Sequence, residues 1–163
     1  GVGLYHAETN VFNMDTDGLG YNGKTAGFAG IVNANGYRGN GSTSLAESTA
    51  TIIANIAVSG WIAGCTVTAT VMASDATNHQ SKTSLLMIDA VNKAGTITAT
   101  LTQADNTTAA SSGTLSCTYT VVDHGDGTID IKANAVSSLT QTYLSGYANI
   151  HLNSDGTGKI IIP

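Results

Sequence analysis

Residues that could carry chemistry are spread thinly along this chain of 163 residues. The segment Asn13-Met14-Asp15-Thr16-Asp17-Gly18 is typical of the start of a calcium loop, because side-chain oxygens alternate before a Gly. The twelfth position of an EF-hand requires a bidentate Glu, and Lys24 stands there, so an EF-hand is excluded. Two interpretations remain for this segment, a looser cation site at Asp15 and Asp17 or an Asx-rich turn, and the turn is favoured.

Three carboxylates, Asp123, Asp126 and Asp130, crowd one predicted hairpin, and paired carboxylates can hydrolyse glycosides. Asp126 belongs to the turn, where water keeps a carboxylate in its ordinary state. The four His residues, at positions 6, 79, 124 and 151, lack metal-ligand spacing, and there is no Gly-x-Ser-x-Gly elbow. We therefore predict no catalytic residue, no metal and no cofactor.

Several aromatic and amide side chains have the chemistry of a sugar-binding surface. A flat ring stacks on the apolar face of a pyranose, and Asn or Arg bonds its hydroxyls. One further candidate is His79 in the polar loop from Asp75 to Ser81, because such loops often carry binding sites. The alternatives are that Trp61 belongs to the core and that the loop around His79 is only solvated. The candidate ligand-binding residues are Tyr21, Tyr37, Arg38, Asn40, Trp61 and His79.

A segment near the C-terminus alternates between two kinds of side chain. Leu144, Ala148, Ile150 and Leu152 form an apolar face. The other face is poor in charge, and an uncharged sheet face lies under another layer or against another subunit. The candidate oligomer-interface residues on that face are Tyr143, Tyr147, Asn149 and His151.

The elements that position these side chains are strands, because the composition predicts an all-β protein. The chain has 19 Gly, one Pro and only 10% charged residues, and β-branched runs such as Thr66 to Val71 alternate between two faces. The spacing favours an antiparallel β-sandwich, jelly-roll-like, of about ten strands. We expect strands near 2–7, 26–33, 50–59, 62–73, 82–90, 96–102, 113–122, 128–134, 140–152 and 158–162.

Three Gly-containing turns, at 92–95, 124–127 and 153–156, predict antiparallel hairpins. They join the segment pairs 82–90/96–102, 113–122/128–134 and 140–152/158–162. Ser44 to Glu47 fits a helix capping box, but the β-branched residues that follow favour a loop and then a strand.

Charge and length narrow the classes of partner. The net charge is −5, and six Lys and Arg are scattered singly, so we expect no nucleic-acid partner. The apolar stretches are too short for membrane insertion. Cys65 and Cys117 lie on predicted strands, either paired across the sandwich or, the favoured alternative, as free buried thiols. We expect a single domain over 1–163, the C-terminal piece of a longer chain.

In style the sequence resembles the C-terminal domains of bacteriophage tail fibres and tailspikes. The resemblance is carried by Asn40-Gly-Ser-Thr-Ser-Leu-Ala-Glu47, by Val122-Asp-His-Gly-Asp-Gly-Thr128 and by the ending that begins at Asn153. It implies a homotrimeric β-sandwich tip that stabilises a trimer or contacts a surface glycan. The histidine-x-histidine metal motif of some fibre tips is missing.

Together the residues and the resemblance predict a non-enzymatic tail-fibre or tailspike domain for host-surface attachment and trimer stabilisation. Its partners would be copies of itself and a host surface glycan, and its location the virion tail. Two alternatives remain, a secreted bacterial carbohydrate-binding module and a glycan-directed hydrolase or esterase.

Overall fold

The computed structural model describes residues 3–6, 9–15, 18–20, 37–58, 60–140, 143–155 and 160–161. Contacts divide the chain into two compact units, Gly1–Asn33 and Ala34–Pro163, and each is described by itself. Every regular element in the described residues is a strand, so the all-β prediction is confirmed. The expectation of one domain over 1–163 stays a prediction.

The first unit holds a three-stranded antiparallel sheet in the order β1-β2-β3. Its strands are β1 (Gly3–His6), β2 (Thr9–Asp15) and β3 (Gly18–Gly20). Asp15 pairs with Gly18 at the end of the β2–β3 ladder, which places the calcium-like segment in a hairpin. The second acidic residue of that segment, Asp17, lies outside the described residues, as does the strand expected over 26–33.

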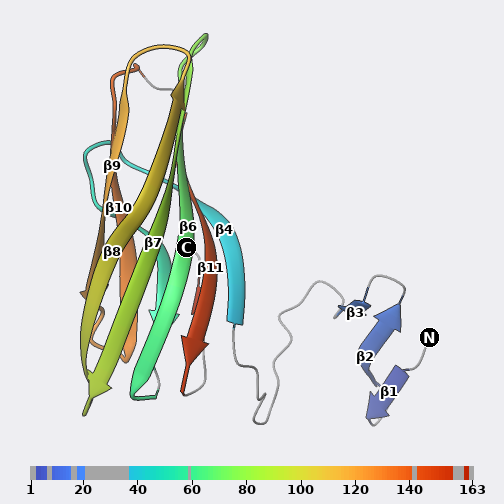
Figure 1. The fold of residues 1–163 in the computed structure, drawn as a ribbon. Coiled ribbons are helices and arrows are strands. Elements are labelled where there is room, and N and C mark those ends of the chain that lie inside the picture. Colours follow the sequence, from blue (N-terminus) through green and yellow to red (C-terminus); the bar gives the residue numbers. More distant parts are fainter. Residues whose placement is uncertain are drawn as a thin grey trace. The chain divides into compact units, whose positions relative to one another are not determined.

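The second unit is a sandwich of a five-stranded and a four-stranded antiparallel sheet (Figure 1). The five-stranded sheet has the order β4-β11-β6-β7-β8 and the other the order β12-β5-β10-β9. The strands are β4 (Tyr37–Ser44), β5 (Thr51–Ala57), β6 (Ile62–Ser74), β7 (His79–Lys93), β8 (Thr96–Ala110), β9 (Leu115–Asp123), β10 (Thr128–Ser137), β11 (Tyr143–Ser154) and β12 (Ile160–Ile161).

Alternation along each strand produces one core between the two sheets. In β6, Val67, Ala69 and Val71 are buried, whereas Thr66 and Thr68, on the alternate positions, are exposed. The opposite sheet contributes its own alternate residues to the same cluster of buried side chains. This period of two is the signature of sheets with one face in a core and one face outside.

The connections nest in the manner of a jelly roll. β4 pairs with β11 in one sheet and β5 pairs with β10 in the other, so the chain wraps back on itself in both layers. Strands β6, β7 and β8 depart from this nesting, because they run as a meander within the five-stranded sheet. The predicted β-sandwich is confirmed, and it differs from a simple jelly roll by this long three-stranded meander.

Two of the three predicted hairpins are confirmed and one is wrong. β7 pairs with β8, and β9 with β10. The expected hairpin of 140–152 with 158–162 does not form, because β12 pairs with β5 in the other sheet. The physical reason is that β11 already has β4 and β6 as neighbours and offers no free edge.

Two expectations from local sequence are also settled. The segment after Ser44 is a loop that leads into β5, with Ser48 at φ 56°, so the loop-then-strand prediction is confirmed over the helix. Cys65 and Cys117 are both free and buried, as the favoured alternative had it. The described residues contain no helix long and apolar enough to cross a membrane.

Candidate functional site

One surface of the sandwich combines low charge with exposed hydrophobic side chains. We call it the outer face: it is the side of the five-stranded sheet that points away from the core. Seven large hydrophobic residues on β6, β7 and β11 are more than a third exposed on it. They are Ile62 (57%), Met72 (38%), Leu85 (40%), Met87 (45%), Val91 (50%), Tyr143 (43%) and Tyr147 (37%).

The rest of this face is mostly Thr and Ser. Thr70 and Thr83 sit opposite each other on β6 and β7, and their hydroxyl oxygens are 3.0 Å apart. The charged side chains described on this face are Asp89 and Asp105, with Lys93 at the hairpin end. Single exposed hydrophobics are ordinary, whereas large contiguous apolar patches are typical of interaction sites.

The predicted interface residues all lie on the outer face. Tyr143, Tyr147, Asn149 and His151 are exposed on β11, and Ile150 between them is fully buried. The hydroxyl oxygens of Tyr143 and Tyr147 are 2.6 Å apart. Hydrogen bonds from Ser145 and from Tyr147 lower the pKa of Tyr143 below its usual value. The two-faced strand is confirmed, and its role as an interface stays a prediction.

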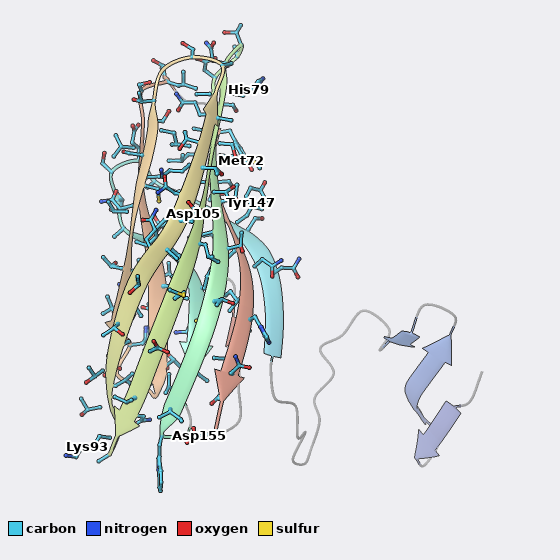
Figure 2. All side chains as sticks on the ribbon, in the orientation of Figure 1. Met72, His79, Lys93, Asp105, Tyr147 and Asp155 are labelled. Carbon is cyan, nitrogen blue, oxygen red and sulfur yellow. The ribbon has the colours of Figure 1, made fainter. Side chains whose placement is uncertain are left out.

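The predicted ligand-binding residues do not form one small site. His79 begins β7, whereas Trp61 precedes β6 at the other end of the same strand pair. The 13 residues of β6 separate them, or roughly 40 Å at ~3.3 Å per residue. Figure 2 shows His79 and Met72 at one end of the sandwich and Lys93 and Asp155 at the other.

The remaining members of that set are on the edge strand or outside the described residues. Tyr37, Arg38 and Asn40 belong to β4, where Arg38 pairs with His151 and Asn40 with Asn149. Tyr21 lies outside the described residues. Trp61 is 80% exposed, so the alternative of a core role for its ring is wrong. His79 was expected in a loop and is instead the first residue of a strand.

A hollow of about 540 Å³ opens at the His79 end of the outer face. We call it the His79 hollow; its lining includes Met72, His79, Ser81, Ala109, Ser111 and Tyr143. These residues come from four strands or their ends, β6, β7, β8 and β11. A hollow of this volume is within the range of small-molecule sites.

The β6–β7 turn beside the His79 hollow is fixed by Asp75. Its Oδ1 accepts hydrogen bonds from the backbone N–H groups of Thr77 (2.8 Å) and Asn78 (2.6 Å). These bonds, together with one from the Asn78 side chain, lower the pKa of Asp75. An Asx turn of this kind holds the start of β7, and with it His79, in one place.

The other rim of the hollow is tied down by Ser111 and Gln80. The His79 N–H donates to Ser111 Oγ (2.8 Å), and the Ser111 N–H donates to the His79 carbonyl (2.9 Å). Gln80 is only 3% exposed. Its Nε2 donates to the Ser112 carbonyl (2.7 Å), and its Oε1 accepts from Ser137 Oγ (2.7 Å) in the opposite sheet.

A second hollow, of about 450 Å³, lies at the opposite end and is lined by residues that include Ile62, Gly64, Asp89 and Val91. Asp155 also lines it, but this carboxylate accepts hydrogen bonds from the backbone N–H groups of Trp61 and Ile62. Those bonds lower the pKa of Asp155. The carboxylate therefore holds the strand start.

The acidic hairpin forms a hydrogen-bonded cluster on the other side of the sandwich. Asp130 is 4% exposed; its Oδ2 is 3.0 Å from His124 Nδ1, and its Oδ1 accepts from Asn55 Nδ2 (3.0 Å). Burial raises the pKa of Asp130, but the bonds from Asn55 and His124 and the charges of His124 and Lys132 outweigh it, so the net pKa is lowered. Asp130 in turn raises the pKa of His124.

The other two carboxylates of that hairpin also accept hydrogen bonds. Asp123 Oδ2 accepts from the Ile97 N–H (2.9 Å), which ties β8 to β9, and Asp126 Oδ1 accepts from Thr128. In the part of the chain that the structure describes, no three His, Cys, Asp or Glu side chains gather closely enough to hold a metal ion.

Sequence reasoning missed the small residues of the His79 hollow. Ala109 and Ser111 carry no chemical signal of their own and reach the site because β8 runs to Ala110. No signal in the sequence marked them, because the strands expected over 82–90 and 96–102 are both shorter than β7 and β8.

Comparison with known proteins gives little similarity. No protein-family model matches the sequence, and no curated protein matches it significantly. Among solved structures, the chain is similar to the crystal structure of the Acinetobacter baumannii phage AM24 tailspike protein, with 10% identity and a TM-score of 0.47. The match covers 77% of this chain and 28% of that protein's chain. A likeness at this level identifies neither a family nor an activity for the chain.

Proposed function

We propose that this chain is a non-enzymatic domain of a bacteriophage tail fibre or tailspike that joins copies of itself into a homotrimer and serves attachment to the host surface. The phage assignment is supported by the resemblance in sequence style at 40–47, 122–128 and 153–163. The trimer is supported by the outer face, which is the single observation that carries this proposal.

The outer face fits a copy of itself better than it fits a charged partner. Leu85 and Met87 stand near its middle and are 40% and 45% exposed. Around them lie Thr side chains, and Asp89 and Asp105 are the described carboxylates on a face that spans five strands. Three such faces can gather around a three-fold axis without burying many unpaired ions, and burying an unpaired ion is costly.

A pair of matched substitutions tests the proposal in the full chain. Met87→Lys places a charge in the middle of the outer face. Val136→Lys places the same charge on the outward side of the four-stranded sheet, where Val136 is 44% exposed. Sedimentation over a range of concentrations would give the dissociation constant of each variant.

We expect Met87→Lys to weaken self-association at least tenfold, about 1.4 kcal/mol, and Val136→Lys to leave it unchanged. Equal weakening by both variants, or by neither, would contradict an interface on the outer face. A wild-type monomer would overturn the trimer and favour the secreted carbohydrate-binding module.

A further inference from the structure

We propose that the His79 hollow binds an uncharged saccharide unit, with the Tyr143 ring against the apolar side of the sugar and the His79 imidazole at its hydroxyls. The proposal gives the attachment function a site and a ligand class. Its biological meaning rests on that proposed function, but its test does not.

The lining of the hollow selects for a neutral ligand. Its residues are Met, Ala, Ser, Gln, His and Tyr, and none of them is Asp, Glu, Lys or Arg. A charged ligand would lose its hydration without gaining an opposite charge, which is costly. A sugar ring with hydroxyls and one apolar side loses much less.

The lining also supplies the two kinds of contact that a sugar ring needs. Tyr143 is 43% exposed and Met72 is 38% exposed, so both offer apolar surface to the hollow. No described residue forms a hydrogen bond with the His79 imidazole, and an imidazole can both donate and accept. Concave sites that are mostly apolar, with a few polar groups, are the usual form of small-molecule sites.

The hollow is built before any ligand arrives. Ser111 holds the backbone of His79 from both its N–H and its carbonyl, and the buried Gln80 links the same rim to the opposite sheet. Because these groups are already ordered, little conformational freedom remains to be lost on binding.

The binding test uses defined probes on the full chain. Saturation-transfer NMR would be recorded with methyl N-acetyl-β-glucosaminide and methyl α-glucoside as neutral probes, and with methyl glucuronide as the acidic control. We expect saturation transfer to one or both neutral probes, at least tenfold weaker binding of the glucuronide, and amide shifts at His79 to Ser81 and Ala109 to Ser111. No transfer to either neutral probe would overturn the proposal.

A matched pair of variants tests the location. Ala109→Leu fills the hollow from the outer face of the edge strand β8, where Ala109 is exposed. Thr98→Leu makes a comparable change on the same face of the same strand at its far end, where Thr98 is also exposed. We expect Ala109→Leu to weaken binding at least tenfold and Thr98→Leu to leave it unchanged. Binding that survives Ala109→Leu would overturn the assignment to this hollow.

Failure of this proposal and failure of the proposed function are distinguishable. The self-association proposed above is centred on Leu85 and Met87, outside the lining of the hollow, and leaves the His79 end of the outer face open to a ligand. The Met87→Lys variant should therefore bind the neutral probes like the wild type. A chain that stays monomeric but binds the probes would contradict the trimer alone. A trimer that binds no probe would contradict the hollow alone.

Discussion

The buried amide of Gln80 gives the sharpest prediction for stability. Gln80→Leu keeps a side chain of similar size and removes two hydrogen bonds of 2.7 Å, one to the Ser112 carbonyl and one from Ser137 Oγ. Each such bond contributes roughly 1 kcal/mol net. Ser112 is exposed, so water can bond its carbonyl in the variant, whereas the buried Ser137 hydroxyl loses the acceptor of its hydrogen. The expected loss is therefore at least about 2 kcal/mol.

Denaturant unfolding at one fixed protein concentration measures this loss. A double-mutant cycle with Ser137→Ala isolates the bond between the two sheets, and we expect a coupling of about 1 kcal/mol. Gln103→Leu is the matched control, since Gln103 is exposed and its bond to Ser84 is 3.3 Å long, and it should cost less than about 0.5 kcal/mol. A cost for Gln80→Leu no greater than that of the control, or a coupling near zero, would refute the reasoning.

Three further predictions concern pH, backbone and thiol chemistry. Because Asp130 raises the pKa of His124, protonated His124 stabilises the folded state. This stabilisation is fully present below the ordinary pKa of 6.5 and is lost as pH rises through the higher folded pKa. His124→Ala should remove this dependence of the unfolding free energy on pH. Gly113→Ala should cost more stability than Gly125→Ala, since a Cβ at Gly113 (φ 68°) would clash with Ser138 Oγ, whereas at Gly125 (φ 85°) it would meet nothing within 4 Å. Burial raises the pKa of the Cys65 thiol to about 12, so a thiol reagent should modify it only in denaturant.

Each of these three predictions would be contradicted by a specific measurement. A wild-type stability that rises between pH 6 and pH 8, with His124→Ala unchanged in slope, would contradict the His124–Asp130 pair. Equal melting temperatures for the two Gly variants would contradict the close approach at Gly113. Rapid labelling of Cys65 in the folded chain, detected by mass spectrometry, would contradict its burial.

Much of the sandwich could be predicted because burial alternates along its strands. Val67, Ala69 and Val71 face one core and their Thr neighbours face outward, so the alternating sequence was enough to predict strand β6. β4 was missed because Gly39 and Gly41 weaken any strand pattern. Gly39 is there for a tertiary reason: a Cβ on it would lie 2.8 Å from the side chain of Ile160, a residue far away in the sequence.

The site was less predictable than the fold. Tyr143 and His79 could be singled out by type, but their meeting at one hollow depends on the register of β11, β6 and β7, in which Tyr143 and His79 both pair with Ser74. Register depends on the turns and on which face each paired strand buries, so the residue types of Tyr143 and His79 do not reveal it.

Light scattering across a dilution series gives the solution mass of the full chain, and with it the number of subunits that associate. We expect a mass of three times the 16.5 kDa chain that persists on dilution into the micromolar range. A mass of one chain at every concentration would contradict self-association through the outer face.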